Sequence, residues 1–508
     1  MLNNGILILL NIFSWRYLFL YILIVKVVLV QLLWLGLIVG PIIGVIAAGI
    51  VIFLENRNVE KAISWLSVMA MFPVVGFIIY LLFGYNLRRK QLFRDKHLEN
   101  SNLRHIAREQ KDKLDQLEFL SRDPDHGNLV KLLLNSGLAP LTLNNKVSVL
   151  TNGEEKFNSL IKALENANHH IHMEYYIFKD DEIGQDIQKL LIRRAKEGLE
   201  VRLIVDGWGS SKLSRSVISR MKDSGVKVEV FLPVKFPYLS SKLNYRNHRK
   251  IVVIDGETGF TGGLNIGDEY LSRDKAKGYW RDTHLHIEGD AVHSLQAAFL
   301  NDWHFITRQV IDGPDYYPDF KQSFPDTLPV QVIASGPDSG SEPMKQAFFS
   351  LLTSANHRIY LETPYFVPDD SMITALKVAA MSGIDVRLVL QGVPEYKLLH
   401  WASRSYFEDL MNAGVKIYTY QKGILHCKVL IIDSEIGFVG SANFDIRSFI
   451  LNFEISALIF SQEFVSRLER DFFEDQANSI ELNLKEFSSR PLIERFREAN
   501  ARLLEPLL

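Results

Sequence analysis

Long uncharged stretches occupy the start of the chain, and a regular alternation of short β-branched and longer amphipathic segments follows them. Residues 27–54 and 62–87 contain no charged side chain. Each run exceeds the roughly 20 apolar residues that span a bilayer. The pattern predicts two transmembrane helices. A buried hairpin in a soluble core is the alternative, and it is disfavoured because uncharged runs of this length are rare in soluble folds.

Residues 1–26 are also largely apolar, with Arg16 as the charged residue that precedes Lys26. They are compatible with an additional span, a surface helix or a signal-like segment. We favour a helix that is retained, because no small-residue cleavage site precedes the next span and Lys26 stands where one is expected. The number of spans before Val27 stays open.

The flanking charge indicates how these spans are oriented. Residues 88–96 are predominantly basic, and they carry Arg88, Arg89, Lys90, Arg94 and Lys96 against Asp95. Because Lys and Arg accumulate on the cytoplasmic side, we expect a multi-pass protein of the cell membrane with its remaining chain in the cytoplasm. The same cluster would attract anionic membrane lipid by about 1 kcal/mol per basic residue. The charged, helical pattern that follows predicts a connector over residues 88–137.

From residue 138 onward the chain repeats itself. Residues 166–206 match residues 354–391, and each copy has the pattern of a strand, an amphipathic helix and a β-branched strand. Strands that alternate with helices of this length predict parallel α/β units. We therefore expect an α/β body built from two repeats, at residues 138–325 and 326–508.

A polar signature of the form HxKxxxxD, followed ten residues later by Asn, stands at the same place in both repeats. Its members are His248, Lys250, Asp255 and Asn265 in the first copy and His426, Lys428, Asp433 and Asn443 in the second. The 14 His residues would produce roughly 0.05 matches to HxKxxxxD by chance. Two matches in register are therefore not accidental.

The spacing of this signature indicates phosphodiester chemistry. His and Lys two residues apart on a strand face the same side, and the Asp then falls at a turn from which a second strand returns. Two such hairpins that meet at an interface would bring two imidazoles, two ammonium groups and two amides together. One imidazole would attack phosphorus, the other would protonate the leaving alkoxide, and the Lys and Asn groups would stabilise the phosphoryl oxygens. With two ammonium groups in the cation positions, no metal or other cofactor is required.

These paired motifs resemble the phospholipase D superfamily, and the surrounding segments resemble bacterial cardiolipin synthases. The similar segments are HMEYYIF, TGGLNIGDEY, YWRDTH, GSANFDIRSFILNFE and the terminal RLLEPLL. The resemblance implies two phospholipase D-like α/β repeats packed as a pseudo-twofold pair, preceded by transmembrane helices. It also implies phosphatidyl transfer between two phosphatidylglycerol molecules, which gives cardiolipin and glycerol through a covalent phosphatidyl-histidine.

The same resemblance assigns roles to residues of this chain. His248 corresponds to the nucleophile and His426 to the general acid and then base. Lys250, Lys428, Asn265 and Asn443 would bind phosphate. Asp282 and Glu454 match the acidic residues that orient the two imidazoles, and a carboxylate does fix the tautomer of its His partner. Asp255 and Asp433 belong to the catalytic set, with stabilisation of their own hairpins as the alternative.

Composition narrows the remaining alternatives. The 57 basic and 59 acidic side chains give a net charge of −2, which disfavours a dedicated nucleic-acid partner. A single Cys excludes a disulfide scaffold and a Cys-rich zinc module. A cluster of three histidines, His169, His170 and His172, could suggest a metal site. We expect ordinary strand packing instead, because adjacent residues on a strand face opposite sides.

Three functions stay in view. They are a membrane-bound phospholipid synthase, a lipid hydrolase of the same superfamily or related phosphatidyltransferase, and a nuclease or non-catalytic scaffold. The family-specific flanks and the membrane anchor favour the first. The Asp-rich run of enzymes that use a nucleotide-activated donor is not found in the sequence. The oligomeric state is not indicated by any pattern.

Overall fold

The computed structural model describes residues 124–233, 244–320 and 324–503, together with isolated positions between residues 23 and 111. Contacts divide the chain into residues 1–90 and residues 91–508, and we refer to the second unit as the body. The predicted spans at 27–54 and 62–87, the extension at 1–26 and the connector before residue 124 lie almost wholly outside the described residues. Within the described residues, no helix has both the length and the apolarity that crossing a bilayer requires.

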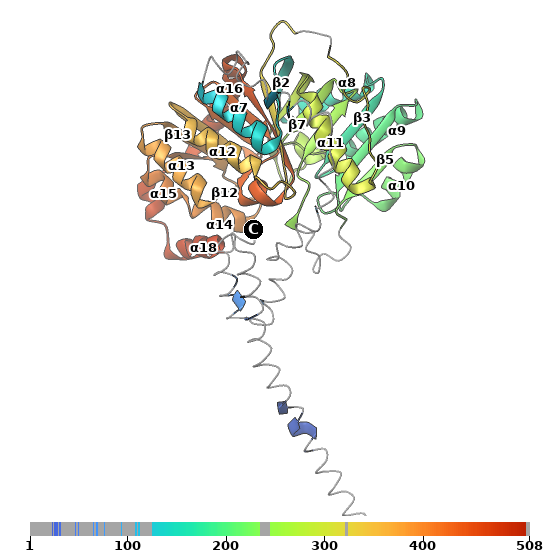
Figure 1. Cartoon of the computed structure of the whole chain (residues 1–508). Helices are drawn as coiled ribbons and strands as arrows, with labels where there is room; N and C mark the ends of the chain where they lie inside the picture. Colours follow the sequence, from blue (N-terminus) through green and yellow to red (C-terminus); the bar gives the residue numbers. More distant parts are fainter. Residues whose placement is uncertain are drawn as a thin grey trace, which may run out of the picture. The chain divides into compact units, whose positions relative to one another are not determined.

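Two large sheets form the body, one in each half of the chain (Figure 1). The first has the strand order β2-β9-β7-β6-β3-β4-β5. Its strands are β2 (Asn145–Thr151), β3 (His170–Tyr175), β4 (Glu200–Asp206), β5 (Lys227–Phe231), β6 (Lys250–Ile254), β7 (Thr258–Gly262) and β9 (Thr283–Gly289).

The second sheet repeats that order as β10-β19-β17-β16-β11-β13-β14, with β1 and β20 added at its two edges. Its strands are β1 (Leu141–Thr142), β10 (Val330–Ser335), β11 (Arg358–Thr363), β13 (Asp385–Gln391), β14 (Lys416–Tyr420), β16 (Val429–Ile432), β17 (Ile436–Gly440), β19 (Glu454–Phe460) and β20 (Ser479–Glu481). The shared order of seven strands confirms the predicted α/β body with two repeats.

Each sheet is mixed, and only part of it is parallel. Strands β3, β4 and β5 are parallel neighbours, and α9 (Glu182–Lys196) and α10 (Arg215–Asp223) connect them. Strand β6 runs antiparallel to β3, and β7 runs antiparallel to β6. The prediction of parallel units therefore applies to three strands of each repeat. The motif lies instead on an antiparallel hairpin, because only antiparallel strands can be joined by a tight turn.

One hydrophobic core is shared by the two halves. It joins Ile251 and Val253 of β6 to Val429 and Ile431 of β16, and it includes side chains of α11 (Val292–Thr307) and α16 (Gln462–Ala477). The outer face of the first sheet packs on α8 (Asn152–Glu165), α9 and α10. The outer face of the second packs on α7 (Pro124–Gly137), α12 (Pro343–Ser354), α13 (Asp370–Met381) and α15 (Phe407–Asn412). Neither half buries its inner face alone.

The segment that precedes the first sheet in the sequence, α7 and β1, packs on the second sheet. Strand β1 pairs with β10, and Gln331 Nε2 donates hydrogen bonds to the carbonyls of Val130 in α7 and Ala139. The proposed start of the first repeat at residue 138 therefore precedes a strand that pairs with the opposite repeat. The proposed division at residues 325–326 lies just before β10 and stays a prediction.

Asp255 and Asp433 close the motif hairpins. Asp255 has a φ of +56° and accepts hydrogen bonds from the backbone N–H groups of Asn168, His169 and His170, at 2.7, 2.8 and 2.9 Å. Asp433 has a φ of +53° and accepts three equivalent bonds from Asn356, His357 and Arg358.

The strand separates these two carboxylates from the imidazoles. His248 precedes β6 and Asp255 follows it, which places them roughly 20 Å apart at about 3.3 Å per residue. The geometry favours the alternative, in which Asp255 and Asp433 hold the hairpin against the preceding loop, and a part in catalysis stays a prediction.

We predict that Asp255→Ala and Asp433→Ala lower stability while turnover per folded molecule persists. Each substitution leaves three backbone donors without their acceptor, which should cost about 1–3 kcal/mol. Thermal unfolding of the purified protein in detergent measures the loss, and Asp186→Ala, which removes an exposed i,i+3 pair with Lys189, is the control. An unchanged midpoint with lost turnover would restore a catalytic role.

Candidate active site

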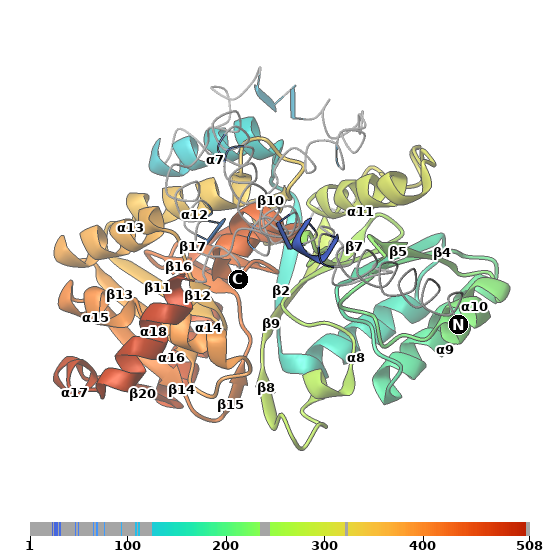
Figure 2. The ribbon, with the colours of Figure 1, turned by 90° about the horizontal axis from the view of Figure 1, so that it is seen from below.

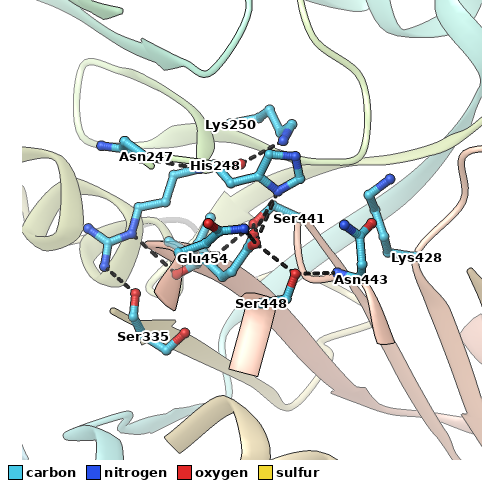
Figure 3. A network of polar contacts seen from close by, with 12 residues as sticks. Asn247, His248, Lys250, Ser335, Lys428, Ser441, Asn443, Ser448 and Glu454 are labelled. Carbon is cyan, nitrogen blue, oxygen red and sulfur yellow. Dashed lines mark hydrogen bonds and ion pairs between the residues drawn. The ribbon is translucent and has the colours of Figure 1, made fainter. Parts of the chain in front are cut away.

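His248 lies between the two halves, two residues before β6. Its backbone N–H donates to the Phe453 carbonyl at 2.9 Å. Its side-chain Nδ1 lies 3.1 and 3.0 Å from the two carboxylate oxygens of Glu454, the first residue of β19 (Figure 3). A histidine of the first repeat is thus oriented by an acid of the second.

The Glu454 carboxylate is fixed on all sides. Ser441 Oγ donates to one oxygen, and Ser448 Oγ at 3.0 Å and Asn452 Nδ2 at 3.3 Å donate to the other. Burial alone would raise the pKa of Glu454, but His248 and Lys250 hold it below its usual value. The group is therefore a carboxylate that can only accept, so the His248 proton sits on Nδ1 and the Nε2 lone pair is free for chemistry.

His426 mirrors this arrangement with the halves exchanged. Its Nδ1 lies 2.7 Å from Asp282 Oδ2, and its backbone N–H donates to the Arg281 carbonyl at 2.7 Å. A short parallel pairing of β8 (Tyr279–Arg281) with β15 (Gly423–Leu425) brings the segments together between the lobes (Figure 2). The two His–carboxylate pairs are therefore crossed: each acid reaches the imidazole of the other repeat.

The two lysines of the motif fold back toward the histidines. Lys250 Nζ donates to the His248 carbonyl at 2.6 Å, and Lys428 Nζ donates to the His426 carbonyl at 2.7 Å. The regular strand begins at Lys250 in one copy and at Val429 in the other, so both histidines precede the strands on which they were predicted. Lys and His still meet, because the lysine stem turns back along the chain.

Burial and like charge lower the pKa values of the two lysines and the two histidines. Burial lowers the pKa of Lys250 to about 7, and Lys428 adds to the shift; burial also lowers the pKa of Lys428 to about 8. Burial lowers the pKa of His248 to about 4; Glu454 opposes this shift, and Lys250 and Lys428 add to it. Burial and Lys428 lower the pKa of His426 as well. The site stores positive charge that an anion would stabilise.

The two asparagines of the motif are not equivalent. Asn265 Oδ1 accepts from the Ile177 N–H at 3.1 Å, and its Nδ2 donates to the Tyr270 hydroxyl at 3.1 Å. Asn443 lies beside Lys428 (Figure 3), and among the described residues its Oδ1 has no hydrogen-bond partner. An amide oxygen can only accept, so a phosphate would need the Nδ2 donor of Asn443, whereas Asn265 would have to exchange its partners.

The sequence analysis missed the residues that complete the site. Ser448 and Asn452 reach Glu454 because the π-helical turn η7 (Arg447–Leu451) directs the chain back toward it. The ring of Tyr176 packs edge-on against His248 at 5.1 Å, and Trp280 packs against His426 at 5.2 Å. All four lie in segments that carry the family resemblance, but no spacing rule predicts a π-helical turn.

Buried arginines behind the histidines hold the halves together. Arg249 Nη1 donates to Asp302 at 2.6 Å, and its Nε donates to the Glu454 carbonyl across the interface at 3.2 Å. The position equivalent to Arg249 in the second repeat is Cys427, which carries no charge. Arg281 of the first repeat crosses the interface instead, and its Nε donates to Asp475 at 2.6 Å.

This second cluster also accounts for a group with metal-ligand geometry. Glu362, Cys427 and Asp475 lie close enough together to hold a cation. The Arg281 guanidinium already supplies that positive charge, and burial raises the pKa of the Cys427 thiol, which keeps it protonated. His172 likewise uses both ring nitrogens, toward Gln296 at 3.1 Å and Arg202 at 3.0 Å, as expected of a packed strand residue.

The duplicated α/β sheets and the crossed His–carboxylate pairs define a phospholipase D-like protein. The family described as "Cardiolipin synthase, PLD-like domain" matches residues 160–303 and 348–476, and "Phospholipase_D-nuclease N-terminal" matches residues 45–84. The chain belongs to the cardiolipin synthase family of PLD-like proteins.

Individual relatives agree with this assignment. "Cardiolipin synthase 2" of Bacillus anthracis is 46% identical over 91% of this chain and 89% of its own length. "Cardiolipin synthase" of Halalkalibacterium halodurans is 45% identical over 97% and 98%. A solved phosphatidylserine synthase of Haemophilus influenzae, 15% identical, superposes with a TM-score of 0.58 over 75% of this chain and 100% of that one, which shows the shared fold.

We predict that binding of a phosphodiester weakens as pH rises from 6 to 9. An amine is charged below its pKa, so Lys250 loses its charge through about pH 7 and Lys428 through about pH 8. Loss of one charged hydrogen-bond donor should weaken binding about tenfold. Dimethyl phosphate keeps one negative charge throughout this range, and an NMR titration measures its affinity. Lys428→Met should remove the transition near pH 8, and an affinity constant from pH 6 to 9 would contradict the prediction.

Proposed function

We propose that this protein is a cardiolipin synthase, which transfers a phosphatidyl group from one phosphatidylglycerol to the headgroup hydroxyl of a second and releases glycerol. The observation that carries the proposal is the pair of crossed His–carboxylate contacts with a buried lysine beside each histidine. The names of the relatives point to the same product.

The first step forms a covalent intermediate on His248. Its Nε2 attacks the phosphorus of the donor lipid, the bond from phosphorus to the glycerol headgroup oxygen breaks, and His426 gives that oxygen a proton. Glu454 holds the Nδ1 proton and stabilises the imidazolium that develops. The bound phosphate brings negative charge next to His426, and together with Asp282 this charge favours the protonated acid.

The second step returns the site to its starting state. Neutral His426 takes a proton from the headgroup hydroxyl of a second phosphatidylglycerol, and that oxygen attacks the phosphorus. The phosphorus–nitrogen bond to His248 breaks, and one glycerol now carries two phosphatidyl groups. One phosphodiester replaces another, so the exchange needs no activated nucleotide donor. Lys250, Lys428 and Asn443 face the phosphoryl oxygens in both steps.

One contact supports His248, rather than His426, as the nucleophile. Lys428 Nζ lies 3.0 and 3.1 Å from the two ring nitrogens of His426, so its N–H competes for the Nε2 lone pair. Among the described residues, no corresponding contact joins Lys250 Nζ to the His248 ring. The His248 lone pair is thereby the more available of two nearly symmetric ones.

The proposal includes a membrane location. The uncharged runs at 27–54 and 62–87 support two spans, and the matched N-terminal family segment at 45–84 covers parts of both. The basic stretch after residue 87 supports a cytoplasmic body. This arrangement would supply an anionic lipid substrate to the active site directly from the bilayer.

We predict that the purified protein converts phosphatidylglycerol alone into cardiolipin and glycerol in equal amounts. Thin-layer chromatography and an enzymatic glycerol assay measure both products. His248→Ala and His426→Ala should abolish them, with the surface variant His304→Ala as control. Phosphatidic acid as the main product would instead establish a hydrolase, and full activity in either active-site variant would remove the two-histidine mechanism.

We also predict that Glu454→Gln and Asp282→Asn lower kcat by about 10²- to 10⁴-fold while the protein stays folded. Each amide keeps the shape of the acid but no longer stabilises an imidazolium. Steady-state kinetics and the unfolding midpoint measure the two effects, and Glu435→Gln at the surface is the control. A kcat within twofold of the original chain would show that the crossed contacts are only structural.

A further inference from the structure

The C-terminal helix α18 (Leu492–Leu503) exposes a row of large apolar side chains. Leu492 is 80% exposed, Ile493 56% and Phe496 66%. They stand at positions i, i+1 and i+4, which lie on one face of a helix. On the opposite face, Glu498 and Ala501 are buried, and Glu498 accepts from Arg404 Nε at 2.9 Å and Arg490 Nε at 2.8 Å. The helix is therefore held firmly with its apolar face outward.

The exposed charge of α18 is positive. Its acids are engaged by the body, because Arg404 also pairs with Glu494 at 3.2 Å. Arg495, Arg497 and Arg502 stay exposed on the helix. Arg497 lies over the Trp401 ring at 5.7 Å and Arg502 over the Tyr406 ring at 4.8 Å. Apolar side chains flanked by basic and aromatic ones are typical of helices that lie in a membrane interface.

The partner helix of α18 follows a segment that contacts Tyr365. α18 packs along α14 (Lys397–Arg404) at the lower end of the second lobe (Figure 1). Tyr396 immediately precedes α14 and is 56% exposed, and its ring lies 6.2 Å from that of Tyr365. Tyr365 donates to Glu395 at 2.9 Å, and Glu395 acts electrostatically on His426.

The exposed start of α14 is thus connected to the imidazoles through a few side chains. The exposed row of α18 formed by Leu492, Ile493 and Phe496 is called here the apolar rim.

We propose that the apolar rim is a docking surface for an anionic lipid bilayer. A lipid's phosphorus must reach His248 while its acyl chains stay in the bilayer, so part of the protein surface has to contact lipid. The rim offers apolar side chains for the acyl region and arginines for the headgroups. The choice of a bilayer as occupant rests on the proposed function.

Site-specific fluorescence tests this surface without requiring activity. Cys427, the chain's one cysteine, is buried, so Phe496→Cys supplies an accessible thiol for an environment-sensitive label. The labelled full-length protein is reconstituted in phosphatidylglycerol vesicles with or without brominated acyl chains. Met381→Cys is the matched control, because Met381 is 74% exposed and ends α13, on another side of the same half.

We predict that the label at position 496 emits at shorter wavelength in vesicles and loses at least half of its emission with brominated lipid. The label at position 381 should do neither. Absence of quenching at 496, or equal quenching at both positions, would overturn the proposal. Disulfide formation between two Phe496→Cys chains without lipid quenching would overturn it in favour of a second copy of this chain as the occupant.

Kinetics provide a second readout. Ile493→Ser combined with Phe496→Ser should raise KM for bilayer phosphatidylglycerol about tenfold, because two apolar side chains lose lipid contact. The kcat and the constants for a soluble short-chain phosphatidylglycerol should not change, and Met381→Ser should change neither. An unchanged bilayer KM would overturn the proposal. Lipid quenching in a protein that makes no cardiolipin would contradict the proposed function and leave the docking surface intact.

Discussion

The contact between each imidazole and a carboxylate of the opposite repeat is the constraint on which the site depends. His248 with Glu454 and His426 with Asp282 can form only when the two halves are docked in one register. The shared core between the sheets enforces that register, because neither inner face is buried without the other half. The second half must therefore be folded before Glu454 can hold the Nδ1 proton of His248 in the first half. Duplication alone would have produced two incomplete sites.

The buried charges behind the histidines show how near-symmetry is broken. Arg249 compensates Asp302 and the neighbouring Glu174 within the first repeat, where burial raises the pKa of Glu174. The second repeat has the same buried acid at Glu362 but Cys427 in place of the arginine, and Arg281 crosses the interface to reach Asp475. A buried acid without a cation is strongly destabilising, so this exchange ties the stability of one half to a residue of the other. It also anchors the strand that presents Asp282.

Electrostatics explain how a nearly neutral protein can accept an anionic lipid. The positive charge is local and is carried by two buried lysines, whose pKa values burial lowers to about 7 and about 8. A phosphodiester would supply the missing negative charge and restore the ordinary protonation of both amines. The rest of the surface has no need to attract polyanions. The exposed apolar row of α18, flanked by arginines, agrees with a substrate that arrives from a bilayer rather than from solution.

The sequence by itself determined the parts that depend on local pattern and repetition. The repeated β-branched segments predicted the two α/β repeats, and the two HxKxxxxD motifs predicted the hairpins and the residues that converge. Tertiary structure alone decided which acid orients which imidazole, since Glu454 is 206 positions from His248 and no periodicity relates them. It also decided that Asp255 and Asp433 cap hairpins, that the strands run partly antiparallel, that β1 joins the opposite sheet and that Ser448 reaches Glu454. Local conformational preference determines strands and turns, whereas the docking of surfaces far apart in the sequence determines which side chains come into contact.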